Sequence, residues 1–570
     1  MEQVPDGSPG GARVDELHPE QCLAVIEQLL PLLLITCSQI KVFIGRWQII
    51  RTRLDALKVC ITDVSESPHW TENELLTDLL PGVHATLLQT RELTRRCTDG
   101  SYNGKLLMQS DLDVVATKIK LHVHDLDLLI KTGVLKQSNA IVLAQPGPGA
   151  GREEVCLFAR DLFARVQIGH TDFKRKALES LVLLLTEDPK NALLVAQEGD
   201  MACLVHVLEC SSNALKDLAV VAVAVLAQTD GCRHGLVVEG ALGPLVRMLE
   251  TGGSACKEKA AVAIEGFTRD GENAWALAAY GGVPALIEVC RTGATGARAP
   301  AAGALRNVAG VEEIRKAMAE EGAIAVLLNL ASSDSIHAQE NAIECLYALA
   351  SNDEKMRQMI AGEGGIQSLL GLLSEPATPK SQELIIRAIN SLSASIIAAK
   401  TLISSSGFLK QLASVLKNGH STVQQLAASA ICNLSFNKET KKALGEAGCI
   451  PPLVKMLESK PSSSQEMAAQ ALSSLLVVET NRREFVKDDK SVSRLVQLLD
   501  PRNQTVAKKF PLSALLALST SKSCRKKIAM AGACQHLQKL AEMEVVGAKK
   551  ILQRIAGSRL RNIFSRRWRD

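Results

Sequence analysis

Paired histidines and acids are the residues of this sequence that come closest to a catalytic or metal-binding pattern. The pairs, each two residues apart, are His122 and His124, Asp111 and Asp113, and Asp125 and Asp127. Two residues along a helix point about 200° apart, so such a pair does not share one metal ion. No phosphate loop, zinc-protease, serine-hydrolase or calcium-loop motif accompanies them. The sequence therefore predicts no enzyme, no cofactor and no metal site, and it places Asp111 at the start of a helix as its N-cap.

Fifteen cysteines are spread along the chain, and none forms a C-x-x-C pair. The nearest two, Cys203 and Cys210, lack the second pair that a zinc site needs. Free thiols in this number indicate a reducing compartment. The N-terminus has no basic and apolar leader, and the longest unbroken apolar run, residues 218–227, is about half a membrane span. We therefore expect a protein of the cytoplasm, with the nucleus as a second location, and with no signal peptide or transmembrane helix.

A phrase of Gly, any residue, an aliphatic residue, two variable residues and Leu recurs along the chain. Its first position falls at 199, 240, 281, 322, 364, 407, 448, 490 and 532, in steps of 41 to 43 residues, with Lys490 once replacing glycine. Glycine ends a helix in the left-handed conformation, and prolines such as Pro284 and Pro451 begin the next one. An alanine-rich helix ends about 27 residues after each glycine. One such unit cannot bury its apolar face alone, so the units must stack.

This period and the run Gly448-Cys449-Ile450-Pro451-Pro452-Leu453-Val454 resemble the armadillo repeat. The resemblance implies an all-α fold, a right-handed α-solenoid of about nine to ten three-helix repeats over residues 155–556. The low aromatic content of 3% agrees with helices packed through small aliphatic side chains.

In armadillo proteins of the importin-α and β-catenin types, asparagines on the third helices grip an extended peptide. Only Asn307 and Asn433 match that position here, and Gly303 and Ser429 replace the neighbouring tryptophan. Nearby polar residues either solvate a helix face or form a partly basic groove for an acidic or mixed segment. The predicted partner-binding groove on the concave surface comprises Asn307, Asn433, Arg269, Arg306, Arg387, Asn390 and Asn437.

Residues 17–135 show helical stripes without the repeat and predict a bundle of about four helices, kinked or broken at Pro31 and Pro81. Residues 1–16 are expected to be disordered, and residues 136–154 to form a Gly/Pro linker that permits many arrangements. Bundle, linker and repeats in this order, with the phrase at residues 161–169, resemble the plant U-box armadillo family. The linker is too short for a U-box and the U-box phrases are missing. The resemblance is therefore to members without a U-box, and ligase activity does not carry over.

Basic residues gather at the C-terminus. The whole chain carries 65 basic and 61 acidic residues, a balance that predicts no nucleic-acid partner, whereas residues 547–570 hold eight Lys or Arg and one Asp. Residues 557–570 are predicted to form a basic amphipathic tail that caps the solenoid, binds an anionic membrane or acts as a nuclear-import signal. Its basic residues are Arg559, Arg561, Arg566, Arg567 and Arg569.

The sequence as a whole predicts a non-enzymatic scaffold or adaptor in signalling or regulation, which presents the armadillo groove to partner proteins. The N-terminal bundle would bind a second partner or another copy of the chain. Two alternatives stay open. One is a component or regulator of a ubiquitin-ligase pathway without its own U-box, and the other is a peripheral membrane-associated armadillo protein that uses the basic tail.

Overall fold

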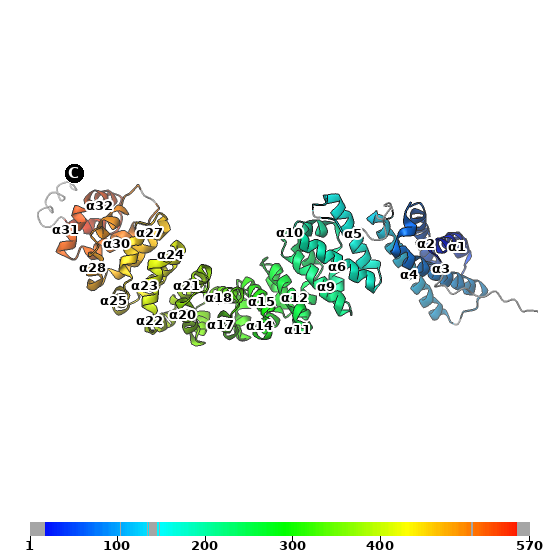
Figure 1. Cartoon of the computed structure of the whole chain (residues 1–570), viewed down its shortest axis with the longest axis horizontal. Coiled ribbons are helices and arrows are strands. Elements are labelled where there is room, and N and C mark those ends of the chain that lie inside the picture. The colour runs from blue at the N-terminus through cyan, green and yellow to red at the C-terminus, as the bar shows by residue number, and fades with distance from the viewer. Residues whose placement is uncertain are drawn as a thin grey trace, which may run out of the picture. The chain divides into compact units, whose positions relative to one another are not determined.

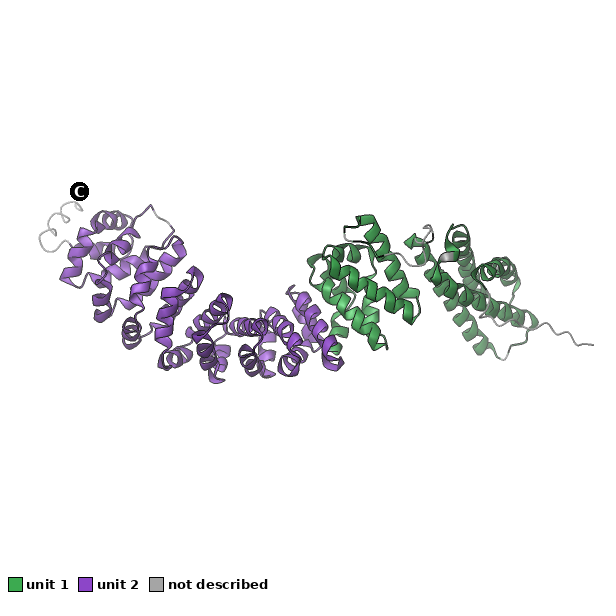
Figure 2. Cartoon of the chain, viewed as in Figure 1, with its two compact units in different colours: residues 1–248 green, residues 249–570 purple. Residues whose placement is uncertain are grey.

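The computed structural model of the chain describes residues 18–102, 104–133, 135, 145–147, 149–502 and 505–555. All regular elements in these ranges are helices (Figure 1). The expected disordered N-terminus, the basic tail and much of the expected linker lie outside the described residues. The chain divides into two compact units, residues 1–248 and 249–570 (Figure 2).

The first unit begins with four long helices that form a bundle. They are α1 (Pro19–Gln39), α2 (Ile44–Ser65), α3 (Glu74–Asp99) and α4 (Lys105–Thr132), with a short 3₁₀ helix, η2 (Trp70–Glu72), before α3. α2 packs along α4, and α1 packs against α2 and α3. Pro31 and Pro81 lie inside α1 and α3, and neither ends its helix. Pro31 is exposed and Pro81 is half-buried, and each helix continues through its proline although this residue supplies no backbone N–H.

Asp111 does not begin α4, contrary to the sequence-based prediction. The helix starts at Lys105, after Gly104, whose φ of 91° turns the chain into the helix. Asp111 therefore lies in the second turn, and its carboxylate is not needed as an N-cap.

α1 is the one helix among the described residues that is long and apolar enough to cross a membrane, with a mean hydropathy of 1.6. It packs against α2 and α3 within the bundle. Burial of one stripe against neighbouring helices is typical of a core helix of a bundle. The buried residues of α1 are Cys22, Leu23, Ile26, Leu29, Leu30, Leu33 and Cys37.

The bundle contacts the start of the repeat region inside the same unit. α4 packs against α5 (Arg152–Ile168), and Ile168 and Phe173 pack on the bundle core. Gln167 Nε2 lies 3.1 Å from His124 Nε2, and His170 Nε2 lies 3.5 Å from Asp78 Oδ2. The sequence predicted a linker that permits many arrangements. In the structure, these contacts hold the bundle against α5 and the residues that follow it.

After α5 and α6 (Thr171–Glu187), helices follow in sets of three. The first helices of the sets are α7 (Asn191–Glu198), α10 (Asp230–Val238), α13 (Asn273–Ala279), α16 (Glu312–Glu320), α19 (Glu354–Gly362), α22 (Ile396–Ser404), α25 (Lys438–Glu446), α28 (Glu479–Phe485) and α31 (Lys522–Met530). The second are α8 (Met201–Glu209), α11 (Leu242–Thr251), α14 (Gly282–Thr292), α17 (Ala323–Ala331), α20 (Gly365–Ser374), α23 (Phe408–Asn418), α26 (Ile450–Met456), α29 (Ser491–Gln497) and α32 (Ala533–Glu542). The third are α9 (Asn213–Ala227), α12 (Ser254–Thr268), α15 (Thr295–Val308), α18 (Ile336–Ala350), α21 (Pro379–Ser393), α24 (Ser421–Leu434), α27 (Ser462–Leu475) and α30 (Lys509–Leu518).

The recurring glycines separate the first helix of a set from the second. Seven of them have φ between 73° and 90°, namely Gly240, Gly281, Gly322, Gly364, Gly407, Gly448 and Gly532. Lys490 is tolerated because its φ is −88°. Gly199 has a φ of −94°, and a Cβ there would lie 2.1 Å from Cε2 of Phe163, so close packing explains this glycine.

In the second unit each third helix packs against the third helix of the next set, from α12 through α30. Alanines such as Ala260, Ala301 and Ala342 are fully buried and let these helices approach closely. A polar contact adds to the packing between α18 and α21. The buried carboxylate of Glu340 accepts hydrogen bonds from Thr378 and Ser381 and pairs with Lys380 at 2.8 Å.

Candidate partner-binding face

The candidate site is a row of partly exposed polar side chains on successive third helices of the second unit, which we call the third-helix face. It is carried by α12, α15, α18, α21 and α24. Six of the seven predicted groove residues belong to it. The face comprises Glu265, Arg269, Arg306, Asn307, Asn341, Glu344, Tyr347, Glu383, Arg387, Asn390 and Asn433.

Asn437, the seventh predicted groove residue, has a local role. It is the N-cap of α25, and its side-chain oxygen accepts a hydrogen bond of 2.8 Å from the backbone N–H of Thr440. The Thr440 hydroxyl in turn lies 3.3 Å from the Asn437 backbone N–H, which completes a capping box. The role of Asn437 in the structure is therefore to cap α25, the first helix of its set.

Asn307 joins its repeat to the preceding one. Its Nδ2 donates hydrogen bonds to the backbone oxygen of Glu265 at 3.1 Å and to the Thr268 hydroxyl at 3.2 Å, both on α12. Its Oδ1 accepts from the guanidinium of Arg306. The amide that was expected to grip a peptide therefore already has partners for its donor and its acceptor.

Asn433 repeats this arrangement on α24. Its Nδ2 lies 3.4 Å from the backbone oxygen of Asn390 and donates to the Ser393 hydroxyl at 3.1 Å. A carbonyl and a hydroxyl three residues later on the preceding third helix are thus the partners in both cases. Asn433 differs in being exposed, and within the described part of the chain its Oδ1 accepts no hydrogen bond. Asn433 Oδ1 is therefore an acceptor that a partner's N–H group can use.

Arg306 connects three successive third helices. Its guanidinium donates to Asn341 Oδ1 at 2.9 Å and to Glu344 Oε2 at 3.4 Å on α18, and it lies 3.8 Å from Glu265 Oε1 on α12. Burial raises the pKa of Glu265, while Arg306 and Arg269 oppose this rise. The positive charge of Arg306 is therefore balanced by two carboxylates.

Gly303 explains why no tryptophan stands beside Asn307. A Cβ at this position would lie 2.2 Å from Oε1 of Glu265. The carboxylate of the preceding repeat occupies the space that a larger side chain would need. Glu265, which pairs with Arg306, thus also accounts for the absence of the importin-type tryptophan at Gly303.

Tyr347 and Arg387 extend the face towards the C-terminus. The Arg387 guanidinium carbon lies 5.7 Å from the centre of the Tyr347 ring, and the same guanidinium pairs with Glu383 one turn away. A guanidinium held over an aromatic ring retains N–H groups at its edge for an incoming carboxylate or carbonyl. Because Arg306 and Arg387 both have acidic partners, the face is of mixed charge rather than basic.

Sequence reasoning missed Glu265, Asn341, Glu344, Tyr347 and Glu383. Asn341 bonds the backbone oxygen of Ala299 at 2.8 Å, another link between neighbouring repeats. These residues share no single register in the repeat. Glu265 and Tyr347 occupy the register of Arg306, 41 positions before and after it, and Glu383 lies one turn before Arg387 on α21. The repeat register and helix spacing therefore signal part of this set.

Among the residues that the structure describes, no group of three or more His, Cys, Asp or Glu side chains is placed to hold a metal ion. His122 Nε2 and the Thr86 hydroxyl share a hydrogen bond of 2.9 Å, and burial lowers the pKa of His122. His124 lies against Gln167, so the two histidines have separate surroundings.

Comparison with known proteins agrees with the repeat geometry. Residues 323–552 match the model of the plant U-box protein ARM repeat region, and residues 24–134 match a domain of unknown function (DUF7032). No curated protein matches the sequence.

Solved structures similar to the chain include designed repeat proteins. A crystallised engineered protein is 26% identical with a TM-score of 0.64, over 70% of this chain and 98% of its own. A designed armadillo repeat protein is 24% identical with a TM-score of 0.39, over 41% of this chain and 99% of its own. One of a set of computationally designed armadillo repeat proteins for modular peptide recognition is 22% identical with a TM-score of 0.39, over 40% and 98%. Residues 323–552 thus match the armadillo repeat region of plant U-box proteins, and the helices of this region follow one another in the sets of three that such repeats imply.

Proposed function

We propose that the protein is a non-enzymatic scaffold that presents the third-helix face to an extended segment of a partner protein. The observation that carries this proposal is the row of polar groups fixed by hydrogen bonds between successive third helices. Groups held in place before binding lose little conformational freedom when a partner docks, so less of the binding energy is spent on ordering.

The centre of the proposed contact lies between Tyr347 and Asn433. Arg387 offers guanidinium N–H groups over the Tyr347 ring, and Asn433 offers a side-chain oxygen that accepts from a peptide N–H. The balanced charges favour a segment of mixed charge over the acidic segment that the sequence alone left open. The match to the armadillo region of plant U-box proteins concerns the repeats and supports the scaffold role without adding ligase chemistry.

Peptide display against the full chain tests the proposal. Selected peptides are measured by fluorescence anisotropy with the wild type, Arg387→Ala and Asn433→Ala. A hydrogen bond to a charged group contributes about 1.5–3 kcal/mol, so Arg387→Ala should weaken binding about tenfold or more. Lys442→Ala is the matched control, because Lys442 lies on α25 in an exposed pair with Glu446 at 3.5 Å.

Peptides that bind the wild type and lose affinity only in the two face variants support the proposal. Peptides whose affinity is unchanged in both variants, or reduced equally by Lys442→Ala, would overturn it. Circular dichroism of each variant separates loss of binding from loss of folding.

A further inference from the structure

The solvent-facing side of α4 carries apolar residues that the bundle does not use. Leu107, Val114 and Leu121 follow one another at seven-residue intervals and are 59%, 47% and 57% exposed. The helix buries a different stripe against its neighbours, namely Met108, Leu112, Val115, Ala116, Ile119, Leu126 and Leu129. The exposed row is therefore a second face of the same helix.

Small or polar exposed residues lie three positions after each of these apolar ones. They are Ser110, Thr117 and His124. Spacings that alternate between three and four give a mean period of 3.5 residues, the repeat of a helix that pairs with another helix in a coiled coil. In this pattern the apolar residues occupy the a positions, and the small or polar residues occupy the d positions.

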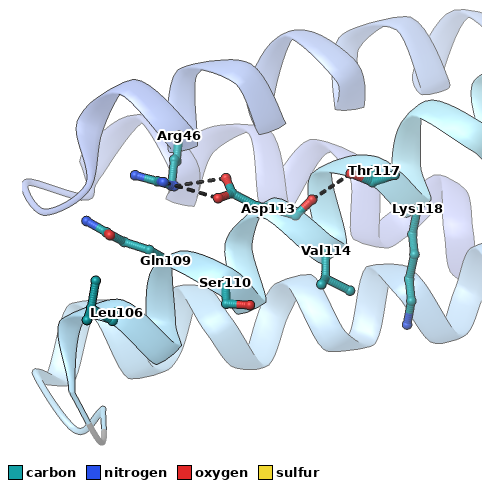
Figure 3. Close-up of a pocket in the computed structure, with 8 residues that line it drawn as sticks. All are labelled: Arg46, Leu106, Gln109, Ser110, Asp113, Val114, Thr117 and Lys118. Carbon is teal, nitrogen blue, oxygen red and sulfur yellow. Dashed lines mark hydrogen bonds and ion pairs between the residues drawn. The ribbon is translucent and has the colours of Figure 1, made fainter.

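Charged residues flank the row on both sides. Asp111 and Lys118 occupy the e positions, and Asp113 and Lys120 occupy the g positions. Figure 3 shows Arg46 of α2 facing Asp113, whose carboxylate accepts hydrogen bonds of 2.8 and 3.1 Å. Lys118 Nζ lies 3.1 Å from Gln89 Oε1. Asp111 and Asp113 thus precede Lys118 and Lys120 by seven residues, and Asp125 and Asp127 occupy the next e and g positions.

We propose that α4 pairs antiparallel with α4 of a second copy of this chain. In the antiparallel register that sets a positions against d positions, Leu107 meets His124 of the second copy, Val114 meets Thr117, and Leu121 meets Ser110. The same register sets Asp111 against Lys118 and Asp113 against Lys120, in both directions. Every apolar knob then faces a smaller or polar residue, and every flanking charge of these four faces its opposite.

The charge pattern makes a second copy a better match than an unrelated helix. An isologous contact must be complementary to itself, and the four charges at Asp111, Asp113, Lys118 and Lys120 meet that condition because acids and bases exchange places on antiparallel pairing. A dimer would also bring two third-helix faces into one assembly, which raises the avidity for a partner with two binding segments.

Analytical ultracentrifugation of the full chain over a range of concentrations tests the proposal. The wild type should approach twice the chain mass of 61.1 kDa as its concentration rises. Val114→Glu should stay at the monomer mass, because it places a carboxylate in the centre of the pairing. Val59→Glu on α2 is the matched control, since Val59 is 60% exposed and lies off the row.

Charge reversal tests the orientation. Asp111→Lys and Lys118→Asp should each weaken the dimer, because each sets like charges against each other in the antiparallel register. The double variant Asp111→Lys/Lys118→Asp should restore it. A parallel pairing sets Lys118 against Asp113 instead, so Asp111→Lys would then have no effect and the double variant would not recover.

A wild type that remains monomeric at all concentrations would overturn the proposal, as would a dimer that Val114→Glu leaves intact or that Val59→Glu dissociates equally. Flotation with phosphatidylserine vesicles tests whether the α4 face binds an anionic membrane instead of a second copy. A monomer that binds these vesicles through Val114 would assign the α4 face to a membrane and reject the second copy.

Discussion

Replacing Asn307 by alanine should loosen the contact between α12 and α15. The change removes two donated hydrogen bonds from a half-buried side chain, to the Glu265 backbone oxygen and to the Thr268 hydroxyl. At about 0.5–1.5 kcal/mol net for each, the loss is about 2 kcal/mol. Arg306 also loses an acceptor, but it keeps its contacts with α18.

Asn433→Ala is the matched comparison, because its amide makes the same kind of link. Its contacts are 3.1–3.4 Å long and the side chain is exposed, so the expected loss is below about 1 kcal/mol. The two variants therefore separate the effect of an enclosed link from that of a solvated one.

Hydrogen exchange of backbone amides is the assay, because the destabilisation should be local to neighbouring repeats. A loss of about 2 kcal/mol corresponds to about 30-fold faster exchange in α12 and α15 for Asn307→Ala. The reasoning is refuted if exchange in these helices is unchanged, or if Asn433→Ala accelerates exchange in α21 and α24 as strongly.

Three further expectations follow from the described contacts. Gly281→Ala should cost about 1–2 kcal/mol because φ is 75°, whereas Lys490→Ala at φ −88° should leave the thermal midpoint unchanged. Burial alone would raise the pKa of Glu340, but hydrogen bonds from a lysine and two hydroxyls outweigh it and hold that pKa below 4.5. The carboxylate therefore stabilises the fold above that pH and loses this effect as the pH falls further. The thermal midpoint of Glu340→Gln should accordingly fall less between neutral and acidic solution than the midpoint of the wild type. Iodoacetamide labelling followed by mass spectrometry should modify the half-exposed Cys210 before Cys432, because burial raises the pKa of the Cys432 thiol to about 12. Equal labelling would contradict that order.

The period of the repeat predicted most of the fold. Glycines such as Gly281 and Gly448, at intervals set by one repeat, mark the left-handed turn between helices, and apolar stripes mark the buried faces. The same logic correctly treated Lys490 as a member of the series. The start of α4 was predicted wrongly, because Gly104 can begin a helix as well as end one, and Asp111 offered a stronger local signal.

The candidate site was less predictable, since its hydrogen bonds join residues about 40 positions apart. Asn307 and Asn433 are recognisable by register, but the sequence does not reveal that their amides bond to the preceding repeat. Glu265 fills the space beside Gly303 only because α12 and α15 pack closely. The α4 row escaped notice because Ser110, Thr117 and His124 interrupt its apolar residues.

The stacking of third helices along the second unit also determines how this part of the chain would respond to tension. Each repeat is held mainly by its two neighbours, so a pulling force along the array would release repeats one after another rather than all together. Gly281 and Gly322 of this unit are 41 positions apart, which is the length of one step. Fully extended, such a step frees roughly 140 Å of chain. Hydrogen-bonded links such as those of Asn307 and Glu340 would determine which junction between repeats breaks last, and the array would lengthen in steps of one repeat.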